Sequence, residues 1–310
     1  KYEEAWKSQK EKAIKMSKKT MYNDDTFDYH IRTRQACNMV YDNDKFRTIK
    51  TDKENRDMVD KMKKEEYNSL QKNDRLSLSG GLKFLSPKFY KLFQNINKFI
   101  KDGKPTGKIL FYSEFRSDAG SEIFEQVLMA NGYTRYDHTN TDNKYDALRY
   151  TFITGQETEV ERKNNKEAFN NKDNLEGKKI QIMIISSAGA EGISLTAVRQ
   201  VHILEPYWNF VRINQVFGRA IRLGSHNDLP ESKRNVEQYL YLSVFPDGNN
   251  IKDIFLSMKK LDTWTTPDVK IDNDLVNYLY TNHNELYGQI QKIVKIKSDT
   301  MYRTVDQLIF

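Results

Sequence analysis

Two arginines and a glutamine stand close together in the segment QVFGRAIR, residues 215–222. Gln215 and Arg219 are four positions apart and Arg219 and Arg222 are three apart, so on a helix their side chains would project from one face. Two guanidiniums and an amide that converge on one point can stabilise the charge of a phosphoryl group during transfer. Apolar neighbours predict a partly buried helix, where charges are costly unless a ligand or partner meets them. The segment therefore predicts a phosphate-handling site, with a surface helix carrying scattered arginines as the alternative.

A second segment, rich in glycine and serine, precedes the arginines by about twenty residues and reads SSAGAEGISL over 186–195. Small residues let backbone amides approach a phosphate or a ribose closely, and the hydroxyl groups add hydrogen-bond donors. A tight turn between a strand and a helix explains this segment equally well when it is taken alone.

Alternating strands and helices are expected to position these two segments. The helical signals include the N-cap Ser86 followed by Pro87, and Gly132 at the end of another helix. Strands that alternate with helices at this spacing predict an α/β fold with a parallel sheet. We expect strands at 108–113, 149–153, 179–185, 201–205 and 239–245, and helices from 86 and over 119–131, 157–170 and 210–223, with another from about 251.

Ligands of such a sheet bind beyond the carboxyl ends of its strands. The residues that follow Ser113, Ile185 and Glu205 are therefore expected to carry the function.

The composition divides the chain into three parts. Residues 1–84 are polar and rich in lysine, and 51–74 has the spacing of a solvated helix that lies on a larger body. This part is interpreted as a structural arm or insertion, and the alternative is an arm that binds nucleic acid. Within it, the segment 29–38 is a candidate for the start of the domain that follows. Residues 85–248 hold the alternating pattern, and 249–310 predict a C-terminal helical extension.

The overall composition excludes several classes of protein. No apolar stretch approaches the roughly 18 residues that a membrane span needs. The single cysteine, Cys37, excludes a disulfide scaffold and a cysteine-based zinc site, and it fits a reducing intracellular compartment. The five histidines have no metal-ligand spacing, so packing or surface roles and no metal site are expected. A net charge of +7 mildly favours a polyanionic partner.

The segment GKPTGK, residues 103–108, looks like a phosphate-binding P-loop but does not satisfy its pattern. Three residues separate its glycines where four are required, and Ile109 stands where a serine or threonine should follow the lysine. We therefore expect a turn here. The chain also has no Asp-Glu pair at a strand end that could hold Mg²⁺ and activate water.

Three segments in this order and spacing resemble motifs IV, V and VI of superfamily-2 helicases: ILFYSEF (109–115), SSAGAEGISL (186–195) and QVFGRAIR (215–222). These motifs belong to the second of two RecA-like lobes. Trp208-Asn209 is similar to the Trp-Asn pair found at this place in the Swi/Snf branch of these helicases. The segment HILEP (202–206), with 209–222 and Ser225-His226, looks like the helicases of nucleocytoplasmic large DNA viruses, of the poxvirus early transcription factor ATPase subunit and nucleoside triphosphate phosphohydrolase I type. The resemblance implies a RecA-like parallel sheet flanked by helices.

The resemblance also implies roles by position. Arg222 would be an arginine finger that reaches the γ-phosphate of ATP held by the opposite lobe, with Arg219 and Gln215 in support. Gly192 and Ser194 would line the ribose or phosphate side of the nucleotide. ATP and Mg²⁺ would be held mainly by an N-terminal RecA-like lobe absent from this chain. The residues expected to contact the backbone of DNA or RNA are Ser113, Phe115, Ser186 and Ser187.

The leading hypothesis is the second lobe of an ATP-dependent helicase or translocase, viral and linked to transcription. RNA polymerase or a transcription-factor subunit is a candidate partner, no membrane is involved, and the virion or the host cytoplasm is the expected location. A non-catalytic RecA-like scaffold in a transcription complex is the alternative, although the intact set of Gln215, Arg219 and Arg222 argues against it. The third hypothesis is an α/β domain that binds a phosphorylated metabolite.

Overall fold

The computed structural model describes residues 31–43, 55–117, 119–138, 147–187, 192–207, 210–243 and 302–303. Among these residues, a seven-stranded sheet has the order β4-β5-β6-β3-β7-β8-β9. Neighbouring strands run parallel except for β8 and β9, which pair antiparallel at one edge. The strands are β3 (Lys108–Tyr112), β4 (Thr134–Arg135), β5 (Arg149–Ile153), β6 (Ile182–Ile185), β7 (Val198–Ile203), β8 (Glu237–Tyr241) and β9 (Tyr302–Arg303).

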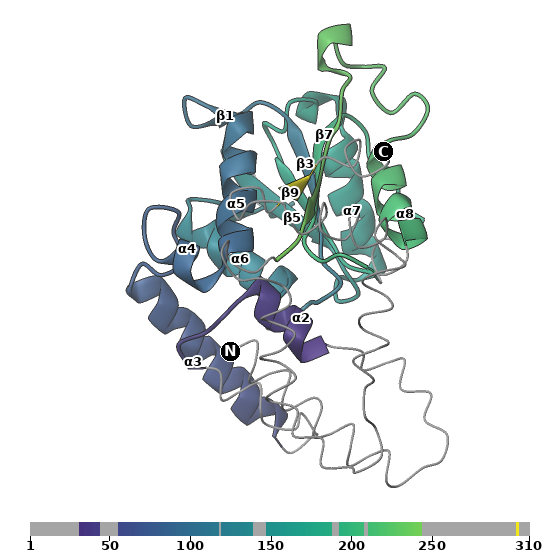
Figure 1. Ribbon diagram of the computed structural model, residues 1–310. Helices are drawn as coiled ribbons and strands as arrows, with labels where there is room; N and C mark the ends of the chain where they lie inside the picture. Colours follow the sequence, from purple (N-terminus) through teal and green to yellow (C-terminus); the bar gives the residue numbers. More distant parts are fainter. Residues whose placement is uncertain are drawn as a thin grey trace, which may run out of the picture. The chain divides into compact units, whose positions relative to one another are not determined.

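Helices cover both faces of this sheet (Figure 1), α5 and α6 on one face and α7 and α8 on the other. The predicted α/β fold, a parallel sheet flanked by helices, is confirmed. The helices are α2 (Ile31–Asn38), α3 (Arg56–Lys72), α4 (Leu82–Leu85), α5 (Pro87–Ile96), α6 (Ser121–Ala130), α7 (Glu159–Asn170) and α8 (Phe210–Ala220).

The central strand β3 supplies both hydrophobic cores, because successive residues of a strand point to opposite faces. Ile109 and Phe111 join the core on the side of α5 and α6, whereas Leu110 and Tyr112 join the core on the side of α7 and α8. All five residues of β3 are buried, as expected for a parallel strand covered on both faces.

The predicted helix signals act as expected. The hydroxyl of Ser86 accepts a hydrogen bond from the backbone N–H of Phe89 and caps α5, with Pro87 at the first helical position. Gly132 has a φ of 85° just after α6, a conformation that glycine adopts without strain. Thr158 and Glu161 form a capping box at the start of α7, which therefore begins two residues later than the sequence pattern suggested.

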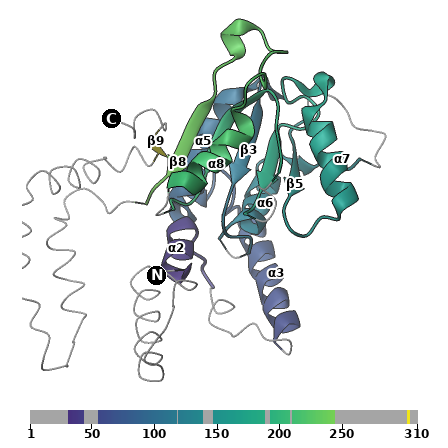
Figure 2. The same ribbon diagram turned by 90° about the vertical axis from the view of Figure 1, so that its right-hand side faces the viewer.

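Helices α2 and α3 lie beyond one end of the sheet (Figure 2), and α3 packs against the main body. Val59, Tyr67 and Leu70 of α3 join the core on the α6 side, as the amphipathic pattern of 51–74 predicted. Gln71 also donates a hydrogen bond to Gln126 of α6, at 2.7 Å between Nε2 and Oε1. The division of the chain at 84 and 248 stays a prediction, and the predicted helices near the N-terminus and after 250 lie outside the described residues.

Several predicted boundaries were wrong: β7 covers Val198–Ile203 where 201–205 was expected, and β8 covers Glu237–Tyr241 where 239–245 was expected. Two further errors have identifiable reasons. The strand expected over 179–185 begins only at Ile182, because Asn174 Oδ1 accepts hydrogen bonds from the backbone N–H groups of Lys179 and Ile180 and holds them outside the sheet. The helix expected over 210–223 ends at Ala220. Arg222 therefore does not project from a helix face, which corrects that part of the expectation.

The P-loop-like segment is a turn, as predicted. Gly103, with a φ of 73°, lies between the short antiparallel strands β1 (Ile100–Lys101) and β2 (Lys104–Pro105). Lys108 is fully buried as the first residue of β3, and its Nζ donates to the carbonyl of Phe169 at 2.9 Å. Burial lowers the pKa of Lys108 to about 7. This amine is therefore not available to a phosphate.

Candidate functional site

The carboxyl ends of three neighbouring strands bring the predicted segments to one edge of the sheet. Tyr112 at the end of β3 pairs with Ile185 at the end of β6 and with Ile203 at the end of β7. The backbone N–H of Ser113 continues this ladder to the carbonyl of Ile185, at 3.3 Å. The ends of β3, β6 and β7, which precede the segments after Ser113, Ile185 and Glu205, therefore lie at one edge of the sheet.

The glycine- and serine-rich segment and the arginine segment are joined by hydrogen bonds. The backbone N–H of Leu195 donates to the carbonyl of Arg219 at 3.0 Å. The guanidinium of Arg222 donates to the hydroxyl of Ser194. Two residues that sequence reasoning assigned to the nucleotide, Ser194 and Arg222, are thus in direct contact.

The end of α8 follows from these same bonds. The carbonyl of Arg219 accepts a hydrogen bond from the backbone N–H of Leu195, and the carbonyl of Ala220 accepts one from the hydroxyl of Ser225 at 3.3 Å. The backbone N–H of Arg222 donates to that same Ser225 hydroxyl, at 3.2 Å. Arg222 is exposed in the turn that results.

The other predicted nucleotide-site residues are also accessible. Gln215 is exposed on α8, and Arg219 is half-buried one turn further on. The Nε of Arg219 is buried and has no hydrogen-bond partner among the described residues. Gly192 is exposed, has a φ of 72°, and has open space where a side chain would stand.

The residues predicted to contact nucleic acid differ in exposure. The hydroxyl of Ser113 is fully buried, 2.7 Å from Glu205 Oε1 and 2.8 Å from the carbonyl of Phe115. Ser186 is also buried, whereas Ser187 and Phe115 are half-buried. A direct contact of the Ser113 side chain with a phosphate would require the hydroxyl to leave these partners, so this residue serves to fix the loop.

Sequence reasoning missed the role of Glu205, which organises the loop after β3. Its fully buried carboxylate accepts hydrogen bonds from Asn38 Nδ2 at 2.6 Å, from the Ser113 hydroxyl, and from the backbone N–H of Glu114 at 2.9 Å. Burial raises the pKa of Glu205, and these hydrogen bonds oppose that effect. The only signal in the sequence was a carboxylate at the end of an apolar strand.

Lys88 of α5 completes this buried network. Its Nζ donates to Asn38 Oδ1 at 3.0 Å and to the carbonyl of Leu204 at 3.1 Å. Burial lowers the pKa of Lys88. The network thereby links α2, α5 and the end of β7, and places α2 beside the loop after β3.

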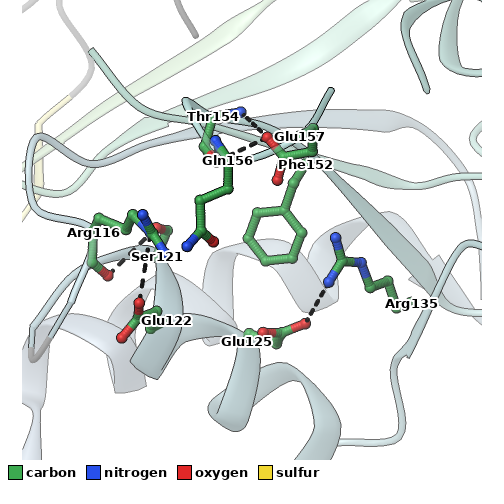
Figure 3. A pocket seen from close by; sticks show the side chains of 9 residues that line it. All are labelled: Arg116, Ser121, Glu122, Glu125, Arg135, Phe152, Thr154, Gln156 and Glu157. Atoms are coloured by element: carbon green, nitrogen blue, oxygen red, sulfur yellow. Dashed lines mark hydrogen bonds and ion pairs between the residues drawn. The ribbon is translucent and has the colours of Figure 1, made fainter. Parts of the chain in front are cut away.

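A polar pocket lies beside this edge, between α6 and the turn after β5 (Figure 3). Phe152 and Gln156 extend into its centre, and its charged groups are largely paired. Arg116 Nε is 3.5 Å from a Glu122 carboxylate oxygen, and Arg135 is 4.0 Å from Glu125. The charged groups of the pocket therefore partly neutralise one another. The lining residues are Arg116, Ser121, Glu122, Glu125, Arg135, Phe152, Thr154, Gln156 and Glu157.

The described histidines have structural roles where their contacts are known. His202 is fully buried, with Nδ1 2.8 Å from the Tyr241 hydroxyl, and His226 Nε2 is 2.7 Å from the carbonyl of Val198. Within the described ranges, no group of three or more His, Cys, Asp or Glu side chains could hold a metal ion. In the same ranges, no helix combines the length and the apolar character that a membrane crossing requires.

Comparison with known families decides what this arrangement belongs to. Residues 91–224 match the family model described as "Helicase conserved C-terminal domain". The chain carries a helicase C-terminal domain. The matched range contains all three motif segments, 109–115, 186–195 and 215–222, so the predicted resemblance to the C-terminal lobe of helicases is confirmed.

Relatives of this helicase C-terminal domain occur in large DNA viruses. A protein of Acanthamoeba polyphaga mimivirus that bears the name of an ATP-dependent RNA helicase is 32% identical over 76% of this chain. An early transcription factor large subunit homolog of African swine fever virus is 34% identical over 54% of the chain, and a termination factor NPH-I homolog of that virus is 45% identical over 31%. The chain spans 37%, 16% and 14% of the lengths of these three relatives.

Proposed function

We propose that this chain is the second lobe of an ATP-dependent nucleic-acid helicase or translocase that acts in viral transcription. One observation carries the proposal: Arg222 is exposed and bonded to Ser194, at the junction of the two helicase segments. The early transcription factor and termination factor names of the relatives support a link to transcription. RNA polymerase or a transcription-factor subunit is the proposed partner, and the virion or host cytoplasm the proposed location.

ATP would lie between this lobe and a partner lobe, with its phosphates toward the turn after α8. Arg222 is exposed and can meet a γ-phosphate, and Arg219 is half-buried on α8 three residues earlier. Gln215, exposed one turn before Arg219, can orient the same group. Charge stabilisation by such arginines is the main protein contribution to phosphoryl transfer.

Mg²⁺ would neutralise the phosphate charge and is assigned to the partner lobe. The described part of this chain has no acidic cluster suited to a divalent cation. This lobe would instead contribute the two arginines and, by moving with the nucleotide state, would shift the bound strand. The backbone of DNA or RNA would lie across the loops after β3 and β6, where Phe115 and Ser187 are accessible.

The test is ATP turnover by the full-length protein with and without added DNA or RNA. Stimulation by nucleic acid supports the motor. Turnover that is absent in both conditions, together with ATP-independent capture of RNA polymerase, would favour the scaffold instead.

A further inference from the structure

Two arginines from distant parts of the chain share one carboxylate at the carboxyl edge of the sheet. Arg34 of α2 pairs with Glu114 Oε2, and Arg212 of α8 lies 3.5 Å from Glu114 Oε1. All three side chains are partly exposed, at 26% for Arg34, 35% for Arg212 and 23% for Glu114. The sequence analysis gave none of the three a role, although Glu114 lies within 109–115 and Arg212 within 209–222.

Each guanidinium also stacks on an aromatic ring. Arg34 lies 5.0 Å from the ring centre of Phe115, and Arg212 lies 4.7 Å from that of Tyr207. Stacking fixes the plane of a guanidinium and leaves N–H groups at its edge for a planar or tetrahedral anion. The face of Phe115 that Arg34 covers is therefore not open to a nucleic-acid base.

The charges at this point do not balance. One carboxylate serves two guanidiniums, which leaves an excess of one positive charge among Arg34, Arg212 and Glu114. Glu114 itself is well placed, because its backbone N–H is held by the buried carboxylate of Glu205 at 2.9 Å. The three side chains thus form a preorganised cationic site beside Phe115, which the proposed function assigns to nucleic-acid contact.

We propose that Arg34 and Arg212 bind phosphate groups of the nucleic-acid strand, and that Glu114 holds both guanidiniums in position until the phosphates displace it. This inference rests on the proposed function and adds to it two residues outside the helicase motifs. The competing interpretation is a structural ion-pair cluster that fastens α2 to α8.

The two interpretations predict opposite effects for Glu114→Gln. In a structural cluster, Glu114→Gln removes both ion pairs and Arg34→Gln or Arg212→Gln removes one, so all three variants would change in the same direction. For a phosphate site, Glu114→Gln removes a competing anion and strengthens binding, whereas the arginine variants weaken it. The backbone bond from Glu114 to Glu205 is kept in Glu114→Gln.

The experiment measures the affinity of the full-length protein for a fluorescent single-stranded oligonucleotide over a series of KCl concentrations. Arg34→Gln and Arg212→Gln should each reduce the slope of log K against log[KCl] by about 0.7, the value for one phosphate contact to a single strand. Glu114→Gln should raise affinity by up to about fivefold at fixed salt, because a partly exposed ion pair no longer has to be broken.

Arg199 offers a matched control, since it stacks on Phe99 at 5.4 Å but stands near the start of β7, at the opposite edge of the sheet. Arg199→Gln should leave the salt slope unchanged. If an arginine-to-glutamine variant does not fold, Arg34→Lys and Arg212→Lys keep the charge and should keep the slope while lowering affinity.

Unchanged slopes in both arginine variants, or weaker binding by Glu114→Gln, would overturn the inference while leaving the proposed function intact. No binding by the wild-type protein would overturn both.

Discussion

The guanidinium of Arg222 donates a hydrogen bond to the hydroxyl of Ser194, which stands 28 residues earlier in the chain. The same side chain donates from Nε to the carbonyl of Gly218 at 3.1 Å. These two bonds use only part of the guanidinium's N–H donors, and the residue remains exposed. The structure therefore holds the proposed arginine finger in a defined position without occupying all its donors.

Ser194→Ala should lower nucleic-acid-stimulated ATP turnover several-fold, because the Arg222 guanidinium loses one of the two bonds that orient it. The measurement is kcat and KM of the full-length protein. We expect kcat to fall with KM little changed.

A double-mutant cycle separates this role from a general structural one. If Ser194 acts by positioning Arg222, the variant with both Ser194→Ala and Arg222→Ala will be no slower than Arg222→Ala alone. Fully additive losses would show that Ser194 acts independently.

Phe124→Ala should destabilise the fold by about 3 to 5 kcal/mol, the usual range for a fully buried phenylalanine. Phe124 of α6 stacks on Phe111 of β3 with ring centres 3.9 Å apart, and neither ring is exposed. Urea unfolding measures the change. Met129→Ala, on the same helix but 48% exposed, is the control and should cost much less.

Acid should weaken the fold in part through His202. Burial lowers the pKa of His202 to about 3 in the folded state, whereas an unperturbed histidine has a pKa of about 6.5. Between these two pKa values the unfolded chain binds more protons than the folded chain. The stability that the neutral His202 contributes is therefore complete above about pH 6.5 and is lost as the pH falls toward 3.

His202→Gln keeps a polar side chain between Gln200 and Tyr241 and removes the titration. Between pH 7 and 4.5 the wild-type protein should lose about 2 to 3 kcal/mol more stability than this variant, by the equivalence of one pKa unit to 1.36 kcal/mol. Urea unfolding at each pH measures these losses of stability. Equal losses in both proteins would show that His202 does not cause the acid sensitivity.

Local signals were sufficient for much of the fold. Ser86 and Gly132 mark helix ends through capping and a positive φ, and both depend only on neighbours in the chain. The wrongly predicted end of α8 has distant causes. Leu195 and Ser225 terminate α8 by taking its last carbonyls, and neither bond can be read from the apolar spacing of the helix.

The residues of the candidate site also fall into those that local sequence predicts and those that depend on distant contacts. Motif residues such as Arg222 could be selected from type and spacing, whereas the contacts of Glu205 could not. Glu205 meets Asn38 across 167 residues of sequence, and Arg34 meets Glu114 across 80. No short pattern connects such pairs, because the sheet and α2 bring them together only in the folded chain.

The most direct test of the central claim is the effect of Arg222→Ala on ATP hydrolysis by the full-length protein in saturating DNA or RNA. An arginine finger contributes about 10³- to 10⁵-fold to kcat, so we expect stimulated turnover to fall by at least about 10³-fold. Arg56→Ala, at an exposed position at the start of α3, should leave turnover unchanged. Stimulated turnover that survives Arg222→Ala at the wild-type level would contradict the assignment of this lobe as the source of the arginine finger.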